Sequence, residues 1–115
     1  GVEIDSAAPG EVAGHMDWRE DRCTAGGVLH GGALMALADS LGGVCAFLNL
    51  PEGAGTSTIE SKTNFMRAVR SGAARAVTRP IHIGRTTIVL HTEIRDDAGR
   101  LVAFVSQTQA VLAPS

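Results

Sequence analysis

Aromatic side chains are scarce in this 115-residue sequence, which has three phenylalanines, one tryptophan and no tyrosine. Stacking platforms for nucleobases are scarce for the same reason, and the core has to be filled by Ala, Val, Ile and Leu. Basic residues are not in excess, because ten Lys and Arg stand against twelve Asp and Glu. The charge balance therefore gives no indication of a nucleic-acid partner or of binding to an anionic membrane surface.

The sequence also lacks the marks of disulfide-rich and metal-binding proteins. Cys23 and Cys45 are too few for a disulfide framework and lack metal-ligand spacing, which indicates a reducing, cytoplasmic location. The histidines form no metal spacing with them, so we expect neither a metal nor a cofactor. The N-terminus has no basic region followed by an apolar stretch, so we expect no signal peptide. The chain begins within a strand pattern, and part of the fold upstream of it could be missing.

Residues 28–50 are apolar enough to raise the question of a membrane span. Asp39 near the middle, two Gly-Gly pairs, His30 and the lack of a basic flank favour a buried helix instead. We therefore expect no membrane partner.

Within this segment, apolar residues recur at three- and four-residue steps over 33–48, which predicts a helix that Pro51 ends. Apolar residues surround most of it, so we expect it to be covered on nearly every side. The interior pair Gly42-Gly43 costs on the order of 1 kcal/mol per residue in helix propensity. We expect a close approach by another backbone to offset that cost.

The remaining segments show the two-residue period that is typical of strands. Val, Ile and Thr dominate them, and turn signals such as Pro9-Gly10 separate them. The predicted strands are two within residues 1–20 and four at 57–69, 73–83, 86–95 and 100–112. Strands joined by short turns are antiparallel, so the predicted α+β fold is one curved antiparallel sheet wrapped around one buried helix. The length fits a single domain over 1–115.

Two features of the helix could carry chemistry. Asp39 is a carboxylate among apolar residues, which is costly unless it is paired or used, although it could also point into a solvated interface. Gly31 and Gly32 open the helix, where free N–H groups and the positive dipole end could stabilise an oxyanion. A plain glycine-rich turn is the alternative. His30 before them could orient a substrate or cap the turn.

Residues 27–39, Gly-Val-Leu-His-Gly-Gly-Ala-Leu-Met-Ala-Leu-Ala-Asp, closely resemble the helix-start signature of hotdog-fold acyl-CoA thioesterases. The resemblance is to the branch acting on phenylacetyl-CoA in phenylacetic acid degradation, 4-hydroxybenzoyl-CoA and related esters. It continues through 58–69, 80–85 and a final strand pair around 97–103. It implies a hotdog fold and thioester hydrolysis.

The resemblance also implies a role for each matching residue. Asp39 is implied as the catalytic carboxylate, either nucleophile or general base, and Gly31 as the N–H donor that polarises the thioester carbonyl. Thr58 matches a strand hydroxyl that assists the attacking water, and His30 matches a residue that positions the carbonyl. Many relatives have Asn or Gln where this chain has Thr24, whose shorter hydroxyl could still hydrogen-bond.

A further departure is Gly43, where some relatives have Ser or Thr one turn after the acid. This difference favours Thr58 as the residue that assists the attacking water.

Coenzyme A is anionic, so basic residues are expected at the mouth of the site, with Arg85 as the first choice. Arginines at strand ends are otherwise commonly solvated. The candidates for binding substrate and CoA are Gly32, Asn64, Arg67, Arg70, His82 and Arg85.

The predicted function is hydrolysis of a small acyl- or aroyl-CoA thioester to free acid and CoA. A non-catalytic acyl-CoA-binding module on the same fold is the main alternative; a hydratase or dehydratase would be expected to show its own His/Asp or His/Glu motif. Gly31 and Asp39 lie about 12 Å apart along a helix, so one chain cannot easily present both to the same carbon. We therefore expect a homodimer, and the resemblance adds a homotetramer.

Overall fold

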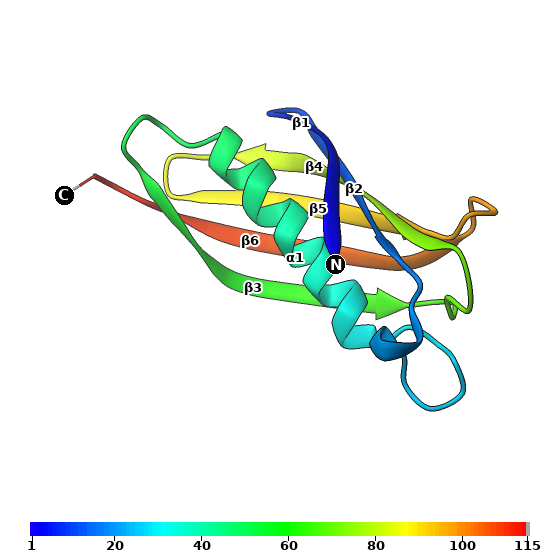
Figure 1. Ribbon diagram of the computed structural model, residues 1–115. Helices are drawn as coiled ribbons and strands as arrows, with labels where there is room; N and C mark the ends of the chain where they lie inside the picture. Colours follow the sequence, from blue (N-terminus) through cyan, green and yellow to red (C-terminus); the bar gives the residue numbers. More distant parts are fainter. Residues whose placement is uncertain (115) are drawn as a thin grey trace.

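Six β-strands and one long helix make up residues 1–114, the part of the chain described in this computed structural model (Figure 1). The strands are β1 (Val2–Ala8), β2 (Glu11–Asp17), β3 (Gly55–Phe65), β4 (Ala73–Ile83), β5 (Thr87–Arg95) and β6 (Leu101–Leu112). The helix α1 spans Gly31–Leu48, and a short 3-10 helix covers Glu20–Arg22. The predicted helix and strands are confirmed. The bounds differ most for β3, which was predicted at 57–69 and spans Gly55–Phe65.

All strands belong to one antiparallel sheet in the order β1-β2-β4-β5-β6-β3. Consecutive hairpins join β4, β5 and β6, whereas β3 pairs with β6 and not with the next strand in the chain. The helix α1 follows β2, lies across one face of the sheet and carries the chain to the opposite edge, where β3 begins (Figure 1). One helix wrapped by one curved sheet is the hotdog arrangement that was expected.

The core between α1 and the sheet is aliphatic, as the composition predicted. Leu37 and Leu41 of α1 and Ile88 of β5 are fully buried. No phenylalanine or tryptophan of residues 1–114 is among the buried core residues. Trp18 packs at the edge of the core and donates its Nε1–H to the carbonyl of Gly27 at 2.9 Å. This contact fixes the loop that leads into α1.

The prediction that α1 is covered on nearly every side is wrong for the single chain. Seven of its residues are buried against the sheet, but Met35 is 43% exposed and Phe47 is 67% exposed. The sheet covers one side of a helix, and the opposite side faces outward here. By length and composition alone Gly31–Leu48 is apolar enough to cross a membrane, yet its buried face packs on the sheet.

The close approach predicted at Gly42-Gly43 comes from a side chain and not from a backbone. A Cβ on Gly42 would lie 2.1 Å from Oε1 of Gln107 on β6, whereas a Cβ on Gly43 would meet nothing within 4 Å. Packing within the chain therefore requires a glycine at the first of the two positions only.

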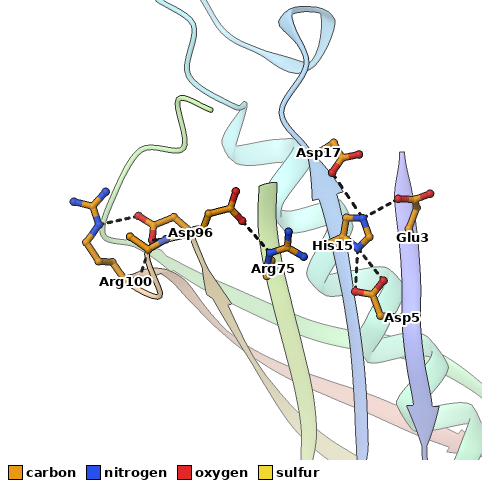
Figure 2. A network of polar contacts seen from close by, with 9 residues as sticks. Glu3, Asp5, His15, Asp17, Arg75, Asp96 and Arg100 are labelled. Carbon is orange, nitrogen blue, oxygen red and sulfur yellow. Dashed lines mark hydrogen bonds and ion pairs between the residues drawn. The ribbon is translucent and has the colours of Figure 1, made fainter. Parts of the chain in front are cut away.

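A polar network joins β1 to β2 (Figure 2). His15 Nε2 lies 2.8 Å from Glu3 Oε2 and 3.7 Å from Asp17 Oδ1, and Nδ1 lies 2.9 Å from Asp5 Oδ1. The hydrogen bond to Asp5 outweighs desolvation and raises the pKa of His15. Glu3, His15 and Asp17 could together hold a metal ion, a grouping that the sequence analysis missed because it spans two strands. Since the carboxylates that surround the imidazole favour its charged form, we interpret the network as a polar link between the two strands.

Candidate active site

The start of α1 presents two glycine N–H groups without backbone acceptors. The N–H groups of Ala33 and Leu34 both donate to the carbonyl of His30, at 3.0 and 3.2 Å. Within residues 1–114, neither Gly31 nor Gly32 donates its N–H to a backbone carbonyl. His30 is the N-cap residue, but its side chain makes no capping hydrogen bond, so the cap alternative is wrong. Free N–H groups at the positive end of a helix are suited to polarising a carbonyl oxygen.

A hollow opens beside this helix start, and its lining includes Thr24, Gly31, Phe65 and Arg67. A Cβ on Gly31 would lie 3.1 Å from the Phe65 ring, so the glycine leaves the N–H accessible beside that ring. Thr24 is exposed, and its hydroxyl points to no partner closer than the carbonyl of Ala25 at 3.5 Å. Three residues predicted for the site are thus brought together in one chain.

Asp39 lies on the exposed face of α1, two turns after Gly31. The expectation that apolar neighbours surround it is wrong, because Leu37 and Leu41 turn toward the sheet and leave the carboxylate facing outward. Gln107 Nε2 donates to Asp39 Oδ1 at 3.2 Å. In the described part of the chain Asp39 forms no ion pair.

Two buried glutamines of β6, Gln107 and Gln109, extend the hydrogen bonding from Asp39 into the core. The sequence did not lead us to predict either of them. Gln107 and Gln109 are each 2% exposed. Gln107 Nε2 donates to Gln109 Oε1 at 2.9 Å, and the Thr58 hydroxyl donates to the same oxygen at 2.6 Å. Hydrogen bonds therefore connect Thr58 to Asp39. A signal was available, because the two-residue period of β6 places both amides on the buried face with Val105.

A second hollow lies between the β3–β4 and β5–β6 connections, and its lining includes Arg67, Arg70, Arg100 and Asp96. Arg100 Nε donates to Asp96 at 2.9 Å (Figure 2). Hydrogen bonds from Arg100, first from its backbone N–H, lower the pKa of Asp96. Neither Arg67 nor Arg70 pairs with a carboxylate within residues 1–114. Both are therefore available to an anion.

Two of the other predicted contacts, His82 and Arg85, lie apart from the helix start. Asn64 is exposed near the end of β3, opposite Phe104 of β6. His82 lies near the end of β4 and Arg85 in the following turn, both exposed, at the end of the sheet away from the start of α1 (Figure 1). One chain does not bring His82 and Arg85 together with Gly31. Their part in binding CoA stays a prediction.

Residues 26–103 match the thioesterase superfamily. The chain belongs to this superfamily. The match includes α1 together with β3, β4 and β5, and with them Gly31, Asp39 and Thr58. The family that the residues around the helix start predicted is therefore confirmed, while the branch within it stays a prediction.

Relatives and solved structures support the same thioesterase assignment. The 1,4-dihydroxy-2-naphthoyl-CoA hydrolase of Escherichia coli K12 is 37% identical over 86 residues, which cover 75% of this chain and 63% of that enzyme. A thioesterase structure from Haemophilus influenzae has a TM-score of 0.92 at 31% identity, over 97% of this chain and 78% of that chain. A hypothetical thioesterase protein with coenzyme A from Streptococcus pneumoniae TIGR4 has a TM-score of 0.88 at 26% identity, over 100% of this chain and 89% of that chain. The chain spans 57% to 69% of the length of four curated relatives that it matches.

Proposed function

We propose that this chain hydrolyses the thioester of a small acyl- or aroyl-CoA to the free acid and CoA. The observation that carries the proposal is the helix start, where the Gly31 N–H lacks a backbone acceptor and faces a hollow. The E. coli relative is named for an aroyl-CoA substrate, and the S. pneumoniae protein was solved with coenzyme A. Both names support a CoA thioester as the substrate of this member of the superfamily.

In this proposal the two helix residues divide the chemistry. Negative charge develops on the carbonyl oxygen as an oxygen nucleophile adds to the thioester carbon, and the Gly31 N–H stabilises that charge. Asp39 either adds directly, forming an anhydride that water then hydrolyses, or removes a proton from the attacking water. The C–S bond breaks and the sulfur leaves as the thiol of CoA. The Thr58 hydroxyl donates to Gln109, which leaves its oxygen as an acceptor toward water.

The proposal includes assembly of two chains, because Gly31 and Asp39 are about 12 Å apart along α1. Two antiparallel helices related by a two-fold axis would place one chain's Gly31 beside the other chain's Asp39. Support comes from the outward face of α1 with Phe47, and from β3, an edge strand whose Ile59 is 61% exposed. The homodimer and the homotetramer are part of the proposal.

The cytoplasm is the proposed location. Cys23 and Cys45 are free thiols, and burial raises the pKa of the Cys45 thiol. Unpaired cysteines are typical of compartments that keep thiols reduced. We propose no nucleic-acid or membrane partner.

Arg67→Gln is expected to raise KM for CoA esters about threefold to tenfold with little change in kcat, because it removes a contact made equally in the ground and transition states. Arg67 lines both hollows and has no ion pair in the described chain. The salt dependence of KM should also become weaker. Arg79→Gln is the control, because this arginine pairs with Glu11 outside both hollows.

Arg85→Gln tests whether the arginine at the other end of the sheet also contacts CoA. It should raise KM as well when two antiparallel copies place one chain's β4–β5 turn beside the other chain's helix start. An increase for Arg85→Gln with none for Arg67→Gln would assign the phosphate contact to Arg85 alone.

Thiol release from a panel of benzoyl-, phenylacetyl-, short aliphatic and long aliphatic CoA esters tests the proposed function. We expect turnover of at least one aroyl or short acyl ester and slower turnover of long aliphatic esters. Binding of CoA esters without thiol release above the spontaneous rate would identify a non-catalytic acyl-CoA-binding module instead.

A further inference from the structure

We infer that Gln107 is a positioning residue for the Asp39 carboxylate and that Gly42 is the glycine that makes room for it. The inference rests on the proposed function, in which Asp39 is the catalytic carboxylate, acting as nucleophile or general base. Across residues 1–114, the contact with Gln107 is the one side-chain hydrogen bond that Asp39 makes. A buried strand amide therefore contacts a carboxylate that is otherwise on an exposed helix face.

The amide of Gln107 fits this network in one orientation. Its Nε2 faces two acceptors, Asp39 Oδ1 at 3.2 Å and Gln109 Oε1 at 2.9 Å. The Gln109 oxygen also accepts the Thr58 hydroxyl at 2.6 Å, and the Gln109 amide nitrogen donates to Thr56 Oγ1 at 3.1 Å. A rotated Gln107 amide would place its oxygen against two other oxygens and lose both hydrogen bonds. The network thus directs an N–H toward the carboxylate.

Burial of this amide carries a cost within the core. Gln107 is 2% exposed, and its Oε1 has no hydrogen-bond partner among the described residues. An unsatisfied buried carbonyl oxygen destabilises a fold, whereas an apolar side chain at this position would pack with Leu90 on the neighbouring strand without that cost. Residues that lower stability without a packing benefit are typical of functional sites.

Gly42 lets the amide reach the carboxylate along the helix. A Cβ at this position would lie 2.1 Å from Gln107 Oε1 and 2.7 Å from its Cδ. Gly42 follows Asp39 by three residues, so the two lie on adjacent turns of one face. Any side chain there would displace the Gln107 amide. The contact gives a reason for a glycine that is unfavourable in the middle of a helix.

The hydrogen bond holds one carboxylate oxygen and leaves Oδ2 for the reaction. An exposed aspartate otherwise samples several rotamers, and a donor fixed in the core selects one of them. Without that donor the carboxylate keeps its chemistry but loses its placement. The loss should therefore appear in kcat and not in KM.

Gln107→Met removes the amide but keeps the length of the side chain and fills the core. We expect kcat to fall about 10- to 100-fold with KM within about twofold of wild type. Gly42→Ala should lower kcat in the same way by displacing the amide, although alanine favours the helix. Thr92→Val is the matched control, since it breaks another buried hydrogen bond, to Thr78 at 2.6 Å, and should lower Tm without changing kcat.

An Asp39→Asn background separates positioning from a purely structural role. Gln107→Met should not lower the residual rate of Asp39→Asn any further, because the carboxylate on which it acts is gone. An equal fall in both backgrounds would overturn the inference, and so would a Gln107→Met kcat within about twofold of wild type. In either case an inactive Asp39→Asn enzyme would leave the proposed function standing. If Gln107→Met does not fold, an unchanged kcat in Gly42→Ala overturns the inference. A wild-type protein that releases no thiol overturns both proposals.

Discussion

Asp39→Asn is expected to lower kcat for CoA-thioester hydrolysis by about 10²- to 10⁴-fold while the protein keeps its fold. Asparagine has the shape of aspartate but supplies neither a nucleophile nor a base. The structure indicates that the change is tolerated, because Asp39 lies on an exposed helix face and pairs with no cation of residues 1–114. An asparagine carbonyl can also accept the same N–H from Gln107. Thiol release and thermal melting together measure the effect.

Asp5→Asn makes the same chemical change at an exposed carboxylate outside the site, where it removes the negative charge beside His15. We expect its kcat to stay within about twofold of wild type. If Asp39→Asn instead retains turnover within a few-fold of wild type, Asp39 is not the catalytic group.

Most of the fold could be predicted because each element buries one face, and that burial is visible as a sequence period. The predicted bounds of β4 are those observed, and β5 differs by one residue at its start. The end of β3 could not be predicted, because it depends on a tertiary contact. The N–H groups of Met66 and Arg67 both donate to the carbonyl of Val102, which ends β3 at Phe65.

The candidate site was predictable only as far as it is local in sequence. Gly31 and Asp39 share one helix and one short motif, and both could be proposed from residues 27–39. Gln107 is 68 residues from Asp39, so its contact depends on how β6 lies beneath α1. The apolar outer face of α1 led to a wrong prediction of burial, because an apolar pattern alone does not say what covers a face, and the sheet of this chain covers the other side of the helix. Exposed Phe47 is consistent with a second copy covering that face.

Mixed dimers of two inactive variants, Asp39→Asn and Gly31→Pro, are expected to recover activity. Proline at the first helical position removes the N–H without breaking the helix. His30 has φ −56° and ψ 137°, a conformation that a residue before proline adopts readily. The added Cβ would lie 3.1 Å from the Phe65 ring, and this ring is 51% exposed and can move. Gly31→Pro should therefore fold and lack only the oxyanion donor.

A site shared between two chains leaves one intact pair in each mixed dimer, Gly31 of the Asp39→Asn chain with Asp39 of the Gly31→Pro chain. With two affinity tags to isolate mixed dimers, we expect about half of the wild-type kcat per dimer. The decisive control places both substitutions in one chain and pairs it with wild type. A shared site is then broken twice and the dimer is inactive, whereas a site within one chain would leave the wild-type protomer working. Activity in this control, with none in the complementing pair, would show that Gly31 and Asp39 act within one chain.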